Sequence, residues 1–229
     1  MSSEEKGSEL LELEEVAKAI PDSVYEQTSE TINTTFIKLV APITESTSGL
    51  GRYIQQKFDN MVEVEKSLLT YSIQNAQNRA IEKNLKIGHV RSPKNLIKIM
   101  EEVSKETESI LNTLWTNLLC SELTNGNSHP FFVDVLSRLS VKDAQILQSL
   151  NTFDNIGSIE SNALILPHRI TSWVLEDNST IHKWDFSSSL LVELGLAKTV
   201  TPSTRVKGTG TVILYRTDIG EDFLNAVRD

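Results

Sequence analysis

The chain has 229 residues, of which 39% are hydrophobic and 23% charged. This composition is that of an ordinary folded protein and excludes an intrinsically disordered one. The single cysteine, Cys120, excludes an internal disulfide and favours a reducing compartment. No stretch is long and apolar enough to cross a bilayer, and the first residues lack the basic and apolar regions of a secretory signal. We therefore expect a cytoplasmic protein.

The net charge of -9 is concentrated near the N-terminus. Residues 1–30 contain nine acids and two lysines, so they carry -7 and leave -2 for the rest of the chain. Residues 1–20 also hold leucines at helical spacing, but the segment is short and its acids repel one another. We treat residues 1–20 as an acidic segment that either docks or stays loose. The body of the chain gains no general attraction for nucleic acid.

Apolar residues at helical spacing predict long helices over residues 21–139. The first starts at Pro21 and Asp22 and continues up to Pro42. The second is one amphipathic helix over 54–85 that ends near Gly88, and the third runs for about eight turns from Pro93 to Leu118. Ser92 is placed to cap the third helix. Towards its end this helix is apolar on all sides, which indicates that several neighbours enclose it at the centre of the fold. His129-Pro130 starts another short helix.

Residues 140–229 show a different order of elements. Ser140 and Asp143 form a capping-box-like helix start. This start opens a helix up to Leu150, and a weaker helix over 163–175 and a short helix over 188–194, stopped by Gly195, follow it. β-branched runs over 197–201 and 211–216 then predict a β-hairpin, and Thr217 caps a last helix. This is the order of a winged helix-turn-helix module. We therefore predict a mainly α fold, with a helical domain at 21–139 packed on a winged-helix-like α+β domain at 140–229.

Residues suited to catalysis or metal binding are scattered. The four histidines, His89, His129, His168 and His182, are far apart, and none pairs with a cysteine or a carboxylate at ligand spacing. Cys120 and His129 could act as nucleophile and base, but Cys120 ends an apolar helix, where a buried and inert thiol is the commoner case. We expect no cofactor, no metal and no enzymatic activity.

Two groups of bases are candidate contacts for phosphate or for a partner. Residues 79–98 form the most basic window of the chain, and its candidates are Arg79, Lys83, Lys86 and Arg91; no aromatic residue is interleaved for base stacking. The loop between the two β runs adds Arg205 and Lys207, which could touch phosphates only weakly. The helix over 188–194 carries one acid and no base, so the module favours packing or protein contact over DNA reading.

Three segments in the central part of the chain form a recognisable pattern: Leu114-Trp115-Thr116-Asn117-Leu118-Leu119, His129-Pro130-Phe131-Phe132-Val133-Asp134-Val135-Leu136 and Leu139-Ser140-Val141-Lys142-Asp143-Ala144-Gln145-Ile146-Leu147. In these segments the chain resembles a known family, the Abi-alpha (abortive infection alpha) proteins of bacteria. The resemblance implies a role in resistance to bacteriophage and carries no catalytic residue over. We expect a defence protein that binds a host or phage component, a protein rather than a nucleic acid, with the oligomeric state open. The alternative is a winged-helix DNA-binding transcriptional regulator.

Overall fold

The structure is a computed structural model that describes residues 20–44, 48–87, 90, 92–124, 128–150, 164–167, 186–200 and 211–228. The described residues fall into two compact units. The first lies within Met1–Arg138 together with Ala226–Asp229, and the second within Leu139–Asn225. The predicted acidic segment lies outside the described residues, apart from Ile20 at its end. No described helix is long and apolar enough to cross a membrane.

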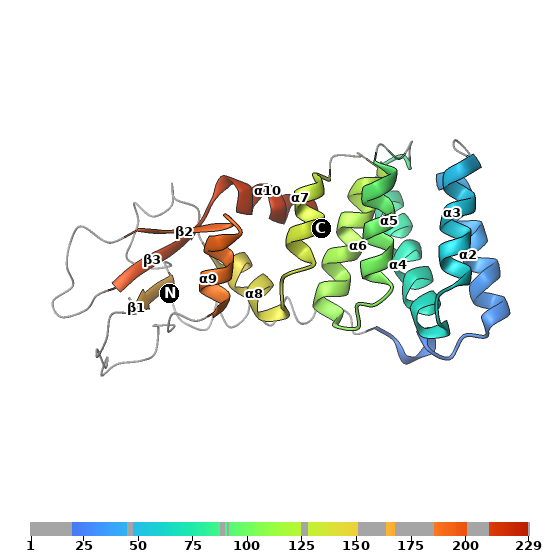
Figure 1. Cartoon of the computed structure of the whole chain (residues 1–229), viewed down its shortest axis with the longest axis horizontal. Coiled ribbons are helices and arrows are strands. Elements are labelled where there is room, and N and C mark those ends of the chain that lie inside the picture. Colours follow the sequence, from blue (N-terminus) through green and yellow to red (C-terminus); the bar gives the residue numbers. More distant parts are fainter. Residues whose placement is uncertain are drawn as a thin grey trace. The chain divides into compact units, whose positions relative to one another are not determined.

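The first unit consists of helices that lie side by side (Figure 1). They are η1 (Asp22–Val24), α2 (Ser29–Thr44), α3 (Ser48–Asp59), α4 (Glu63–Glu82), α5 (Pro93–Val103), α6 (Ser109–Thr124) and α7 (Pro130–Leu136). Helix α4 packs against both α6 and α2, α5 packs against α6, α3 against α2, and α7 against α5. At the edge formed by α2 and α3, the rings of Phe36 and Phe58 stack with their centroids 3.6 Å apart.

Helix α6 is the centre of this unit. Eleven of its sixteen residues are buried, on every side of the helix, and Trp115 is only 2% exposed. The prediction that neighbours enclose this helix is therefore confirmed. A polar contact also joins α6 to α4, because the side chains of Asn112 and Ser72 form hydrogen bonds of 3.3–3.4 Å with each other. Such buried polar pairs fix the register between two helices more strictly than apolar contacts do.

Two of the predicted helices are too long. The helix expected over 54–85 is two helices, because α3 ends at Asp59 and α4 begins at Glu63 after Val62 in an extended conformation. The helix expected over 93–118 is also interrupted between α5 and α6. There the Ser104 hydroxyl donates to the carbonyl oxygen of Glu101, a local bond that competes with the helix. Neither break contains glycine or proline, so periodicity alone does not reveal it.

The first predicted helix is also shifted. The chain makes a 3₁₀ turn at Asp22–Val24, and the α-helix starts only at Ser29 and continues to Thr44, past the expected end near residue 42.

The second unit is a small antiparallel sheet with helices. Its elements are α8 (Val141–Ser149), β1 (Leu164–Pro167), α9 (Phe186–Glu193), β2 (Ala197–Val200), β3 (Thr211–Arg216) and most of α10 (Asp218–Val227). Strands β2 and β3 pair antiparallel, which confirms the predicted hairpin. The strand order is β1-β3-β2, with Leu164 opposite Leu214 and Ala197 opposite Arg216. Helix α9 packs against α8 and β2.

Strand β1 corrects the prediction of a helix over 163–175. Residues 164–167 form an edge strand instead, and residues 168–175 lie outside the described residues. A short apolar run such as Leu-Ile-Leu fits a strand as well as a helix. Proline is tolerated on an edge strand, where a missing amide hydrogen breaks no ladder.

The caps predicted at Ser140, Gly195 and Thr217 are confirmed, whereas α9 begins at Phe186, before the helix predicted over 188–194. Ser140 and Asp143 form a full capping box, in which the Ser140 hydroxyl accepts the Asp143 amide hydrogen at 3.3 Å and the Asp143 carboxylate accepts the Ser140 amide hydrogen at 2.7 Å. Gly195 follows α9 with φ +71°, a left-handed conformation that favours glycine. The Thr217 hydroxyl accepts the amide hydrogen of Gly220 at 3.1 Å and so caps α10.

Candidate functional site

The candidate bases of residues 79–98 lie in different environments in the structure. Arg79 is half-buried on α4, and its guanidinium donates to the side-chain oxygen of Asn117. Asn117 in turn donates from its amide nitrogen to the carbonyl oxygen of Val227 at 2.9 Å. Arg79 therefore links α4, α6 and the end of α10 inside the first unit. Lys83 and Lys86 are exposed just after the end of α4, a position where the helix dipole favours cations.

The remaining candidate bases, Arg91, Arg205 and Lys207, lie outside the described residues. Helix α9 of the second unit, which precedes the β hairpin, has an outward face that the structure describes. Phe186, Ser189 and Glu193 are exposed there, and Phe186 is 78% exposed. This face has no base, as the sequence indicated, and it carries an aromatic ring.

Cys120 and His129 do not form an evident catalytic pair. Cys120 is buried in α6, whereas His129 is exposed and precedes α7 as its N-cap residue. The Nδ1 atom of His129 accepts the amide hydrogen of Phe131 at 3.1 Å, so this nitrogen is occupied in holding the helix start. Among the described residues, no group of three or more His, Cys, Asp or Glu side chains is close enough to hold a metal ion.

A buried carboxylate, which the sequence analysis missed, joins three helices. Glu122, near the end of α6, is 1% exposed. It accepts the amide hydrogen of Ser92, the residue before α5, at 3.2 Å, and the hydroxyl hydrogen of Ser128, just before α7. Asn95 closes a ring by donating to the Ser128 carbonyl oxygen at 2.9 Å. We call Glu122, Ser92, Ser128 and Asn95 the Glu122 ring. In the sequence, the only sign of this ring is a glutamate on an otherwise apolar helix.

Burial raises the pKa of the Glu122 carboxyl above its usual value, and the hydrogen bonds from Ser128 and Ser92 act in the opposite direction. No cation is needed to explain how this acid is held, because the starts of α5 and α7 both supply donors. The Glu122 ring is therefore explained by its role in tying helix ends together.

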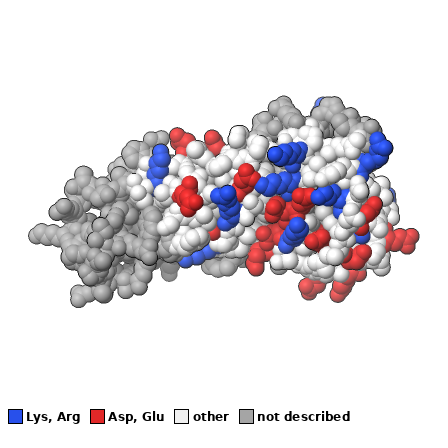
Figure 2. Space-filling model, in the orientation of Figure 1, with Lys and Arg blue, Asp and Glu red and all other residues white. Residues whose placement is uncertain are grey.

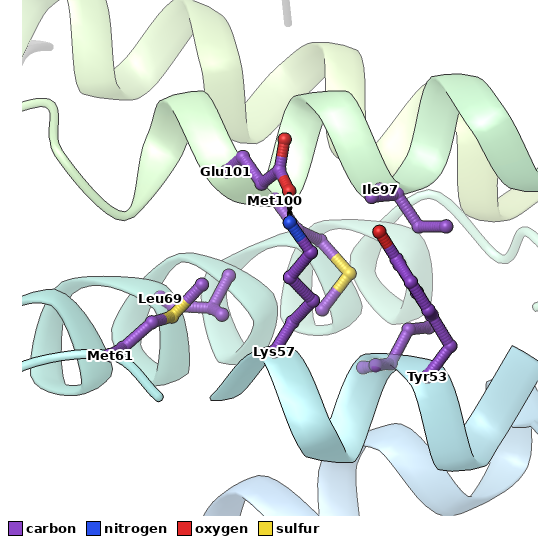
Figure 3. A pocket seen from close by; sticks show the side chains of 8 residues that line it. Tyr53, Lys57, Met61, Leu69, Ile97, Met100 and Glu101 are labelled. Atoms are coloured by element: carbon purple, nitrogen blue, oxygen red, sulfur yellow. Dashed lines mark ion pairs between the residues drawn. The ribbon is translucent and has the colours of Figure 1, made fainter. Parts of the chain in front are cut away.

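A small crevice lies between α3, α4 and α5 (Figure 3). Its volume is about 240 Å³ including the part that is open to solvent, and its lining residues are Tyr53, Ile54, Lys57, Met61, Leu69, Ile97, Met100 and Glu101. A typical small-molecule site has about 300–1,000 Å³, and the space that this crevice encloses is far smaller, because the value above includes open solvent.

The rim of this crevice is polar, although its floor is apolar. The Lys57 ammonium lies 2.7 Å from the Glu101 carboxylate and 5.7 Å from the centroid of the Tyr53 ring. The dashed line in Figure 3 marks this ion pair, which links α3 to α5. The hydrogen bond and the charge of Glu101 raise the pKa of Lys57.

Charges elsewhere on the surface of the first unit are mixed. Lys98 on α5 forms an ion pair with Asp134 on α7, and this bond, helped by the nearby Arg138 and Lys94, lowers the pKa of Asp134. Figure 2 shows acids and bases interleaved on the visible face. A surface of this kind does not attract a nucleic acid backbone strongly.

Comparison with known proteins gives one finding. The family model described as "Abortive infection alpha" matches residues 65–227, from the first turn of α4 to the end of α10. No curated protein and no solved structure is similar enough to the chain to count as a match.

Proposed function

Because this chain belongs to the abortive infection alpha family, we propose that it is a bacterial anti-phage defence protein that acts in the cytoplasm by binding a host or phage component. The family match over residues 65–227 carries the proposal. We propose further that the protein has no catalytic activity of its own. The occupied Nδ1 of His129 and the small volume of the crevice support this second point.

The surface that we propose for binding is the outward face of α9. We propose that the second unit is winged-helix-like, since α8, β1, α9, β2 and β3 follow one another and the strand order is β1-β3-β2. In such a module the helix before the hairpin is the one that contacts a partner. Here that helix presents Phe186, Ser189 and Glu193 and no base, which favours a protein partner.

Expression of the gene in a phage-sensitive host is the test of the defence role. We expect the plating efficiency of at least one phage to fall; an unchanged efficiency against a broad panel would contradict the proposal. A Phe186→Ser, Glu193→Lys double variant should lose protection with the fold retained, as judged by circular dichroism. The matched control is Gln74→Ala, which changes an exposed residue of the first unit and should protect as the unchanged protein does.

The second candidate is a winged-helix DNA-binding regulator, and the strand order is the observation that favours it. Retention on duplex DNA at low salt, where phosphate contacts are strongest, tests it. Binding that is weakened by Arg205→Glu and Lys207→Glu would support the regulator. A protein that passes through the DNA column even at low salt would rule it out.

A further inference from the structure

We propose that copies of this chain associate head to tail through the two ends of the first unit, one end of each copy docking on the opposite end of the next. The first of these ends, which we call the acidic end, is where α3 turns into α4 and α5 into α6. The second, the basic end, is where α4 stops and α5 starts. The inference does not depend on phage defence, because it concerns contacts between copies of this chain.

The charged side chains of this unit are sorted between its two ends. The acids of the acidic end are all exposed or half-exposed, and they outnumber Lys66 and Lys105 there: Asp59, Glu63, Glu65, Glu102, Glu106 and Glu108. The basic end carries the exposed lysines Lys83, Lys86 and Lys94 against Glu82. Figure 2 shows mainly acids along the lower edge of this unit, the edge at which α3 turns into α4 in Figure 1. The two ends are therefore complementary in charge.

The dipoles of the single helices do not explain this sorting. A helix dipole favours acids in the first turn and bases in the last. Helix α4 follows this rule, since Glu63 and Glu65 stand in its first turn and Lys83 directly follows its end. Helix α5 returns past α4 in the opposite direction and breaks the rule, because its first turn holds Lys94 and no acid, and its last turn holds Glu102 and no base. In both helices the sign of the charge follows the end of the unit, at a cost to the stability of α5.

The acids at the acidic end also repel one another. Burial raises the pKa of the Glu106 carboxyl, and the negative charges of Glu108 and Glu102 raise it further, while hydrogen bonds from the backbone at residues 107 and 108 act in the opposite direction. Lysines brought by another copy would relieve this repulsion. The acidic end therefore gains from a basic partner.

Each end exposes aliphatic side chains beside its charges. Val62 and Val64, at the start of α4, are 64% and 48% exposed, and Ile81, in its last turn, is 70% exposed. Val62 is also the N-cap residue of α4 and provides no side-chain cap, although a serine there would stabilise the helix. An apolar centre with a polar rim is the composition of a protein interface. A nucleic acid would need a continuous track of bases instead.

The two ends cannot meet within one chain. Helix α4 runs from one to the other, and its 20 residues keep them about 30 Å apart. A contact between unlike ends leaves one free end on each copy, so it builds open chains and does not close at a dimer. With so few side chains the contact belongs to the weak, transient class of interfaces that bury less than about 1,200 Å². We therefore expect association only at high protein concentration.

Sedimentation equilibrium of the full-length protein tests the proposal. The average mass should rise with protein concentration beyond that of a dimer, and it should fall as added salt screens the charges. Val62→Ser with Glu102→Lys removes the acidic end, and Ile81→Gln with Lys94→Glu removes the basic end. Each variant should associate at least several-fold more weakly than the unchanged protein. All four changes suit their helices, since serine caps α4, glutamine is a good helix former and both charge reversals agree with the dipole of α5. A loss of association is then not a loss of fold.

The matched control is Ile37→Gln with Lys38→Glu. This pair makes the same kinds of change at exposed residues midway along α2, away from both ends, and should associate as the unchanged protein does.

Mixing the two end variants gives the sharpest outcome. Each retains the end that the other has lost, so an equimolar mixture should form dimers of one chain of each kind and nothing larger. The proposal is overturned if the unchanged protein is monomeric at every concentration, or if it stops at a dimer, as a symmetric contact between like ends would. End variants that associate as the unchanged protein does, a control that loses association, or a mixture that stays monomeric would overturn it equally.

Discussion

Replacing Glu122 with alanine is expected to destabilise the first unit by about 2–4 kcal/mol. The side chain is 1% exposed and accepts hydrogen bonds from the Ser92 amide and the Ser128 hydroxyl. Alanine leaves the buried Ser128 hydroxyl and the part-buried Ser92 amide without an acceptor, at about 1–3 kcal/mol each, and water that enters the vacated space lowers the sum. For a chain of this size the melting temperature should fall by about 4–15 °C.

The variant Glu122→Gln separates charge from hydrogen bonding. It keeps the shape and an acceptor oxygen, so near neutral pH we expect a stability within about 1 kcal/mol of the unchanged protein. Burial raises the pKa of the Glu122 carboxyl above the 4.5 of a free side chain, so the folded state binds this proton more tightly than the unfolded state does. The stability that this tighter proton binding contributes is fully present below the pKa that Glu122 has in the unfolded state. It is lost as the pH rises through the pKa that Glu122 has in the folded state. The unchanged protein should therefore lose stability relative to Glu122→Gln as the pH rises above 4.5.

Urea unfolding followed by Trp115 fluorescence measures these differences in the first unit alone. Trp173→Phe and Trp184→Phe remove the other two tryptophans from the signal. Glu63→Gln is the control for the loss of an exposed acid, because its side chain is 57% exposed. The reasoning fails if Glu122→Ala costs less than about 0.5 kcal/mol, or if the difference between glutamate and glutamine is the same at pH 5 and pH 7.

Three further predictions concern packing and charge. Trp115→Ala should cost about 3–5 kcal/mol in urea unfolding, because the ring is 2% exposed; a stable but inactive variant would mean that Trp115 belongs to a binding site. Gly220→Ala should cost about 1–3 kcal/mol, since a Cβ atom there would overlap a backbone carbonyl oxygen, whereas Gly49→Ala has open space and should be neutral or stabilising by up to about 1 kcal/mol in thermal melts. In Lys98→Met the pKa of Asp134, followed by NMR, should rise towards its usual value, and an unchanged titration would show that Lys98 is not its main cause.

Local signals in the sequence predicted the helix ends that depend on neighbouring residues. The Ser140 and Asp143 capping box, the left-handed Gly195 and the Thr217 cap are all found where expected, because each is complete within a few residues. The centre of the fold could also be predicted, since an all-round apolar helix such as the one around Trp115 has to be enclosed.

Features that depend on long-range packing could not be predicted in this way. The breaks after Asp59 and Val103 carry no glycine or proline, and the apolar spacing continues across both of them. Strand β1 exists because β3 offers it an edge, and a four-residue run holds no periodicity that would distinguish strand from helix. The partners of Glu122 lie 30 and 6 residues away in the chain, so its burial appears in the sequence only as an acid on an apolar helix.

The enclosed position of α6 has a consequence for how the first unit opens. Amide hydrogens exchange through local openings, and the slowest of them belong to the elements with the most buried neighbours. The order of exchange should therefore run from α3, which packs on α2 at an edge, inward to the amides around Leu118 and Leu119, which are fully buried. Any event that loosens this fold without unfolding it would begin at α3 or α7, and the pair of α4 and α6 would be the last part to separate.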